Sequence, residues 1–132
     1  MGDFWEVFGE MLEIKSKEGL LMKKKDFKGR CEKRSLSKCV GVCKTYDKLQ
    51  SVYADMLQAD NDIVEIRCNV LLEGAEYTTD FVCTKSNQEL RVRECVNRSH
   101  LTKPLTIKML DISKEYWLKR GVEDWGLVIS EK

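Results

Sequence analysis

The sequence is poor in several features that mark special classes of protein. It has one proline and one histidine in 132 residues, and it contains no run of 18 or more apolar residues. The missing apolar run excludes an ordinary membrane-spanning helix. Hydrophobic residues make up 42% of the chain, and no collagen-like repeat or low-complexity linker interrupts it, so a disordered or fibrous protein is also excluded. A chain of this length buries about two-thirds of its unfolded surface on folding, and we therefore expect a single domain over residues 1–132.

The N-terminal segment, residues 1–14, contains four acidic residues and no basic one. A secretory signal instead begins with a basic region and ends at a small-residue cleavage site, so we expect a cytoplasmic protein without a membrane partner. Apolar residues at helical spacing predict an appended amphipathic helix over residues 3–14. Such a helix would cover a groove on its own domain, the active site, a partner surface, or a twin subunit in a homodimer.

Six cysteines are present, and no two of them form a CxxC pair. They lie within strand-like or helix-like patterns, and a chain of this length needs no disulfide framework to fold. A zinc site made of Cys31, Cys39, Cys43 and the single His100 is an alternative, although knuckle-type spacing is missing. We therefore expect reduced, mostly buried thiols at Cys31, Cys39, Cys43, Cys68, Cys83 and Cys95.

The net charge of +1 hides an uneven distribution along the chain. Residues 15–48 hold twelve basic and four acidic residues, a net charge of +8, whereas residues 49–94 carry a net charge of −5. A basic stretch interleaved with apolar and small residues suits contact with a nucleic-acid backbone, and a solvated basic face is the alternative. The candidate nucleic-acid-binding residues in this stretch are Lys23, Lys24, Lys25, Lys28, Arg30, Lys33, Arg34 and Lys38.

Hydrophobic periodicity predicts two further helices. Apolar residues recur at intervals of three and four from Tyr46 onward, which predicts a helix over 45–59 with Thr45 as its N-cap. A second helix with Pro104 in its first turn shows the same spacing and ends before Gly121.

Strict alternation of apolar residues predicts a strand over 64–72. Two further strand-like runs, 77–84 and 89–96, are separated by a polar loop of hairpin length, and a last strand is expected over 125–130. The order helix, three strands, helix, strand predicts an α/β fold with a mixed central sheet flanked by helices.

The predicted hairpin brings two acidic residues together. A turn centred on Asn87 pairs residues whose numbers sum to about 174, so Asp80 faces Glu94. Glu94 shares its strand face with apolar residues, where an unpaired carboxylate is costly to bury. Two carboxylates supply the oxygen ligands that Mg²⁺ prefers, so the pattern predicts a magnesium site that acts on a phosphodiester. The alternative is a surface hairpin with its register shifted by one or two residues, which leaves both acids in water.

The segments around these acids resemble a known nuclease family. EYTTDFV, ending at Val82, and LRVRECV, ending at Val96, are similar to the Y-x-x-D-F and hydrophobic-E-x-K motifs of the PD-(D/E)XK nuclease superfamily. Within it, the chain most resembles TnsA-like endonuclease subunits of heteromeric transposases. The resemblance extends from about Lys33 to the end of the chain and includes TYDKLQ at 45–50 and KPLTIK at 103–108.

This resemblance implies a restriction-endonuclease-like fold and an endonuclease that uses Mg²⁺ or Mn²⁺. The enzyme would cut one strand of double-stranded DNA at transposon ends, beside a partner transposase subunit. Asp80 takes the family's aspartate position, Glu94 the following acid position, and Gln50 the position of a glutamate on the first helix. These three residues are the implied catalytic metal ligands.

Two positions depart from the family pattern. Val96 stands where the family has a catalytic lysine, and Gln50 stands where it has glutamate, although Asp47 could supply the missing charge. Arg98 is a candidate substitute because it can hold a phosphate, although arginine does not act as a base at neutral pH. The departures motivate an alternative function, a nuclease-like DNA-binding or assembly subunit without hydrolysis. The other candidate phosphate-contacting residues, on the second helix, are Lys103 and Lys108.

Overall fold

The described part of the chain folds around a mixed sheet of five strands in the order β1-β7-β6-β5-β4. The computed structural model describes residues 4–7, 31–75 and 77–130. Neighbouring strands run antiparallel, except that β6 and β7 are parallel. The strands are β1 (Phe4–Val7), β4 (Ile63–Leu72), β5 (Tyr77–Lys85), β6 (Leu90–Val96) and β7 (Asp124–Ser130).

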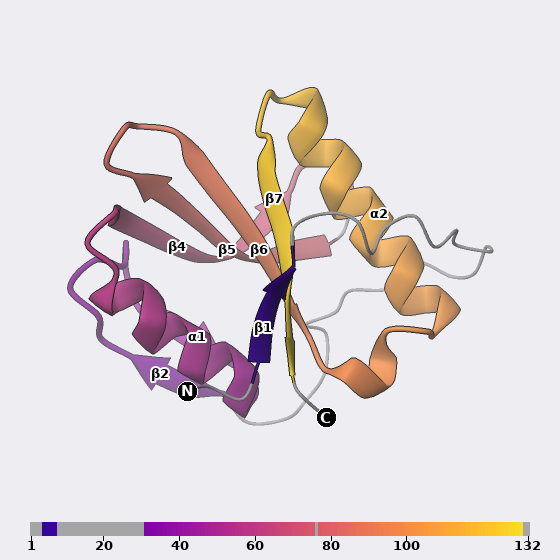
Figure 1. The fold of residues 1–132 in the computed structure, drawn as a ribbon, viewed down its shortest axis with the longest axis horizontal. Coiled ribbons are helices and arrows are strands. Elements are labelled where there is room, and N and C mark those ends of the chain that lie inside the picture. The colour runs from indigo at the N-terminus through magenta and orange to yellow at the C-terminus, as the bar shows by residue number, and fades with distance from the viewer. Residues whose placement is uncertain (1–3, 8–30, 76, 131–132) are drawn as a thin grey trace.

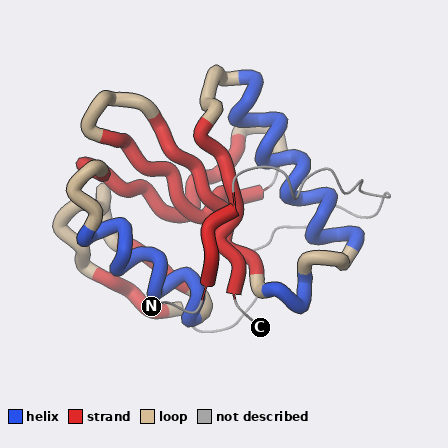
Figure 2. Tube along the Cα trace, viewed as in Figure 1, coloured by secondary structure: helices blue, strands red, loops and turns tan. Residues whose placement is uncertain are grey.

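One long helix lies on each side of this sheet (Figure 1), and Figure 2 shows the same view by type of element. α1 (Lys48–Ala59) precedes β4, and α2 (Pro104–Lys119) follows a 3₁₀ turn at Arg98–His100 and connects β6 to β7. A small antiparallel pair, β2 (Glu32–Arg34) and β3 (Cys43–Thr45), precedes α1. The predicted mixed sheet flanked by helices is therefore confirmed. Among the described ranges, neither long helix is long and apolar enough to cross a membrane.

The two faces of the sheet build two separate hydrophobic cores. Neighbouring residues of a strand point to opposite faces, and Cys95 and Val96 of β6 accordingly belong to different cores, as do Leu127 and Val128 of β7. α2 covers the core that contains Val96, whereas α1 covers the core that contains Cys95. The buried helix residues in these cores are Met109, Leu110 and Trp117 of α2 and Leu49, Tyr53, Ala54 and Leu57 of α1.

Most of the predicted elements are confirmed, because alternation and helical spacing are local properties of the sequence. β4, β5, β6 and β7 lie within one residue of the predicted bounds, and α2 begins at Pro104 and ends before Gly121. The hairpin register is also confirmed, since Phe81 pairs with Arg93 and Val82 with Val92.

The predicted N-terminal helix is wrong over residues 4–7, and residues 8–14 lie outside the described ranges. Phe4–Val7 form β1, which pairs antiparallel with β7, Phe4 lying opposite Ser130. Four residues are too few to separate a helical from a strand period, and the choice depends on a partner strand far along the chain. This segment therefore belongs to the central sheet rather than to an appended helix.

The predicted start of the first helix at Thr45 is also wrong. Thr45 ends β3, where it pairs with Glu32 of β2, and Asp47 is the N-cap of α1. The Asp47 carboxylate Oδ1 accepts a hydrogen bond from the Gln50 backbone N–H at 2.9 Å. Both residue types cap helices well, and the β2–β3 pairing decides between them.

A cluster of charges around Asp124 ties three strands together at one end of the sheet. Arg93 of β6 is fully buried, and its guanidinium contacts Asp124 Oδ1 at 2.9 Å. Lys85 of β5 contacts the other carboxylate oxygen, also at 2.9 Å. Burial alone would raise the pKa of Asp124, but hydrogen bonds from Lys85 and Arg93 outweigh it and lower that pKa.

We predict that Asp124→Ala destabilises the protein by about 3 kcal/mol, because it leaves the buried Arg93 guanidinium without its carboxylate. The exposed neighbouring substitution Glu123→Ala is the control, with an expected change below about 0.5 kcal/mol. A carboxyl group whose pKa is lowered by folding stabilises the folded protein at pH values above the ordinary aspartate pKa. This contribution is lost as the pH falls through the lowered pKa of the folded state. Urea unfolding from pH 7 to pH 3 should therefore show the difference between Asp124→Ala and the unmodified chain shrinking in acid. A difference that grows in acid would contradict the prediction.

Candidate functional site

The regular alternation of side chains along β5 is interrupted at Asp80, the first of the predicted site residues. Phe81 packs in the core under α1, whereas Thr79 accepts a hydrogen bond at 3.0 Å from the indole N–H of Trp117 on α2. Residues two apart in a regular strand share a face, so the strand twists between these positions. The residue opposite on β4 is Asn69, which adopts a positive φ of 55°. The irregularity thus spans two neighbouring strands at the site.

Asp80 and Glu94 contact each other where the regular pairing of β5 with β6 ends. Backbone pairing extends to Phe81 opposite Arg93. Beyond it, the Asp80 backbone N–H donates a hydrogen bond to Glu94 Oε1 at 3.1 Å, and the Cys95 N–H donates to Asp80 Oδ2 at 2.8 Å. The two carboxylates therefore accept hydrogen bonds in place of backbone carbonyls, and side chains hold the strands together at this point.

Glu94 is turned toward α2 and has no solvent exposure. The Ser113 hydroxyl on α2 donates a hydrogen bond to Glu94 Oε2 at 2.7 Å, and the Trp125 indole N–H donates to Ser113 Oγ at 3.0 Å. Asp80 is 2% exposed, and its Oδ1 is shielded from solvent as well. Burial of a carboxylate is tolerable when each oxygen accepts a hydrogen bond, as both oxygens of Glu94 do.

Mg²⁺ at this pair would meet the right ligand atoms in the wrong surroundings. Asp80 and Glu94 offer hard carboxylate oxygens from adjacent strands, as the sequence predicts. Magnesium, however, usually keeps several water molecules, and both side chains are buried, with each oxygen of Glu94 already accepting a hydrogen bond. The donor chemistry fits the ion, and the solvent access does not.

Gln50 closes the first turn of α1. Its side-chain oxygen Oε1 accepts a hydrogen bond from the Tyr46 backbone N–H at 2.9 Å, while its own N–H bonds to the Asp47 cap. This reciprocal pattern resembles a capping box, and it gives the side chains of Asp47 and Gln50 hydrogen-bond partners within the helix end. Gln50 belongs to α1 and Glu94 bonds to α2, so the structure fastens these two residues to helices on opposite faces of the sheet.

The remaining candidate positions follow Glu94 along the chain, from the end of β6 to the start of α2. Val96, at the lysine position, is 4% exposed and packs in the core under α2. β6 ends there, so Arg98 does not continue the strand; it bonds to Ser130 through its backbone N–H, at 2.9 Å, and its Nε. Lys103 and Lys108 lie at the start of α2, the former exposed and the latter half-buried.

The described part of the basic stretch divides into cations that fasten the fold and cations that face solvent. Arg34 pairs with Asp55 of α1, and Lys38 Nζ donates to the Asp60 backbone oxygen at 2.7 Å. Lys33 is exposed and lies directly opposite Lys44, also exposed, across β2 and β3. Sequence reasoning did not single out Lys44, because only the strand pairing makes it a neighbour of Lys33. The predicted residues Lys23, Lys24, Lys25, Lys28 and Arg30 lie outside the described ranges.

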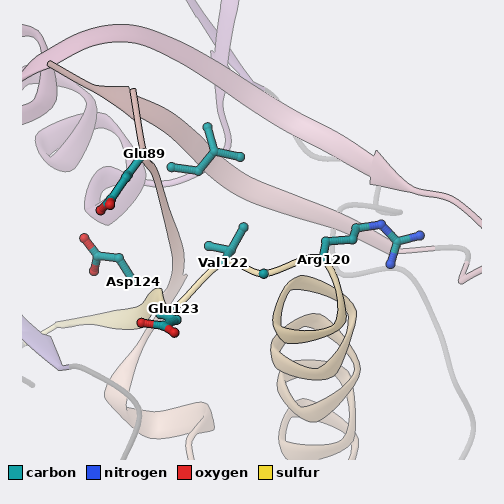
Figure 3. A pocket seen from close by; sticks show the side chains of 7 residues that line it. Glu89, Arg120, Val122, Glu123 and Asp124 are labelled. Carbon is teal, nitrogen blue, oxygen red and sulfur yellow. The ribbon is translucent and has the colours of Figure 1, made fainter. Parts of the chain in front are cut away.

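A pocket of about 590 Å³ lies away from the acid pair, at the C-terminal end of α2 (Figure 3). Its labelled residues are Glu89, Arg120, Val122, Glu123 and Asp124, of which three are acidic. Of the predicted catalytic and nucleic-acid-binding residues that the structure describes, none lines it. The pocket therefore does not add to the sequence-predicted site.

The six cysteines are all free, as predicted, with Cys43, Cys83 and Cys95 buried. The alternative zinc set is not assembled as proposed, because the sulfur atoms that converge are those of Cys39, Cys43 and Cys68. His100 is exposed in the 3₁₀ turn after β6. Cys68 could not be found from local spacing, since β4 approaches the other two cysteines only through the tertiary fold.

No family model and no curated protein matches this chain. The resemblance to nuclease motifs therefore depends on the quoted residues alone, and functional inference rests on the geometry of the site.

Ser113 offers a direct test of how the buried carboxylate is held. We predict that Ser113→Ala destabilises the protein by about 1–3 kcal/mol, because Glu94 Oε2 and the Trp125 N–H both lose their partner. Thr106→Ala on the same helix is the matched control, with an expected loss below about 0.5 kcal/mol. Urea unfolding measures both variants, and equal losses would refute a special role for the Ser113 hydroxyl.

Proposed function

We propose that this chain is a DNA-binding subunit with a nuclease-like α/β core, in which the acid pair serves the fold rather than hydrolysis. Support for the core comes from the order α1, β4-β5-β6, α2, β7, which agrees with the nuclease-like segments noted in the sequence. A restriction-endonuclease-like fold is part of this proposal. Any strand cleavage would then fall to a partner subunit, such as the transposase that the resemblance implies.

The observation that carries the proposal is the burial of Glu94. A metal-dependent nuclease needs carboxylates that meet both water and a phosphodiester. Here Glu94 is fully buried, and both of its oxygens accept hydrogen bonds from protein donors. The lysine position is filled by Val96, which packs in the same core. These features favour a structural carboxylate over a ligand.

Contact with DNA is supported by the like charges on the β2–β3 pair. Lys33 and Lys44 lie directly opposite each other and are exposed, an arrangement that is unfavourable in isolation. A phosphate backbone would neutralise both charges and release counterions. The pair belongs to the stretch 15–48, where the chain concentrates its positive charge.

A second candidate, a DNA endonuclease that uses Mg²⁺ or Mn²⁺, is favoured by one observation, the hydrogen bond from the Asp80 backbone N–H to Glu94 Oε1, which brings the two acidic residues together. Neighbouring carboxylates repel each other, and a divalent cation would relieve the repulsion. Asp80, Glu94 and Gln50 would hold such an ion, which would supply an activated water. This candidate requires the site to open, with Glu94 leaving Ser113.

DNA binding is tested by reversing the exposed charges. We predict that the double variant Lys33→Glu/Lys44→Glu binds a double-stranded DNA fragment about tenfold or more weakly, with a salt slope reduced by about 2. The double variant Lys114→Glu/Lys119→Glu on α2 reverses the same number of charges elsewhere on the protein and is the matched control. Fluorescence anisotropy over a salt series measures both. Equal losses in the two double variants would contradict a specific role for the β2–β3 pair.

Hydrolysis is tested with supercoiled plasmid in Mg²⁺ or Mn²⁺. We predict no nicking above that of an Asp80→Ala variant purified in parallel.

We also predict that Glu94→Gln keeps or raises thermal stability, because the amide can accept a hydrogen bond from the Asp80 N–H and donate one to Ser113 Oγ without a buried charge. Nicking that Asp80→Ala and Glu94→Gln both abolish would establish the endonuclease instead.

A further inference from the structure

Three cysteines from separate segments converge beside the edge strand of the sheet. Cys39 lies in the loop between β2 and β3, Cys43 is the first residue of β3, and Cys68 lies within β4. Their sulfur atoms all lie within 4.8 Å of one another, and those of Cys43 and Cys68 are 2.7 Å apart. Cys43 is buried, whereas Cys39 and Cys68 are half-buried.

This spacing suits a thiophilic metal ion. Thiolates bound to tetrahedral zinc lie about 2.3 Å from the ion, which places the sulfurs about 3.8 Å from each other. Sulfur atoms within 4.8 Å of one another reach that spacing by small side-chain rotations. We propose that Cys39, Cys43 and Cys68 form a zinc site with three thiolate ligands and a fourth position on the solvent side. The inference is independent of the proposed function.

Zinc binds the thiolate form of cysteine, so the three thiols release their protons when the ion binds. The positive charge of Arg34 acts on both Cys39 and Cys43 and favours their charged forms. Three thiolates around Zn²⁺ carry a net charge of −1, which the Arg34 cation partly offsets. The polar and charged neighbours thus match the charge of a loaded site.

A bound ion would fasten the β2–β3 pair to the central sheet. The Val40 backbone N–H donates to the Ile66 carbonyl at 2.9 Å, and the Ile66 N–H donates to the Lys38 carbonyl at 2.8 Å. The segment around Cys39 therefore already lies along β4, whose other side pairs with β5. A metal bridge from Cys39 and Cys43 to Cys68 would lock this attachment, so metal loading should stabilise the folded protein.

The test is metal binding by the full chain after removal of metal with a chelator. Zinc analysis is expected to give one ion per chain, and Co²⁺ titration is expected to give thiolate-to-cobalt charge transfer with tetrahedral ligand-field bands. Cys39→Ser, Cys43→Ser and Cys68→Ser should each lower the affinity tenfold or more, and Zn²⁺ should raise the melting temperature of the unmodified chain but not of these three variants. Cys31→Ser, which lies outside the cluster, is the matched control and should bind as the unmodified chain does.

The half-buried positions Cys39 and Cys68 keep the test valid if Cys43→Ser fails to fold, which circular dichroism would show. Several results would overturn the proposal. They are the absence of the charge-transfer band, an equal loss of affinity in Cys31→Ser, and a Cys43–Cys68 disulfide without zinc in protein purified in the absence of reductant, as read by alkylation and mass spectrometry.

Discussion

The structure depends most on the hydrogen bonds that join Asp80 of β5 to Glu94 and Cys95 of β6 where the regular pairing of these strands ends. Each carboxylate accepts a hydrogen bond from a backbone N–H of β5 or β6, so the strands stay joined after their regular ladder ends. Ser113 carries this connection to α2, and Trp125 carries it on to β7. A cluster that superficially resembles a catalytic pair is therefore also the junction between the sheet and one of its helices. Removing any one of these side chains leaves a buried polar group without a hydrogen-bond partner, which is costly in an apolar core.

This junction explains why the acids and the remaining candidates do not form one open site. Glu94 faces α2, whereas Gln50 is part of the N-terminal cap of α1 on the other face. Exposed cations gather instead on the β2–β3 pair, beside the start of α1. The exposed cations that we propose to bind DNA are thus separate from the acid pair, in agreement with the proposed subunit that holds DNA without cutting it. The cysteine cluster lies where backbone hydrogen bonds join the segment between β2 and β3 to β4.

Local patterns predicted the strands β4 to β7, the helix α2 and the hairpin register, because side-chain period and turn chemistry act over a few residues. The contact of Asp80 with Glu94 followed from that register alone. Properties set by distant partners were missed. Residues 4–7 form a strand because they pair with β7. Asp47 rather than Thr45 caps α1 because Thr45 belongs to the β2–β3 pair. Cys68 lies beside two other cysteines only through the tertiary fold. The inward turn of Glu94 was equally hidden, since it depends on a serine in the following helix.

Hydrogen exchange of the Asp80 and Cys95 backbone amides, followed by NMR with and without Mg²⁺, tests the structural role of the acid pair most directly. If both carboxylates accept these N–H groups permanently, the two amides exchange as slowly as those in the centre of the sheet, and Mg²⁺ changes neither their rates nor their chemical shifts. Rapid exchange at both positions, or a saturable shift of both amides with Mg²⁺, would contradict this role and point to a metal site.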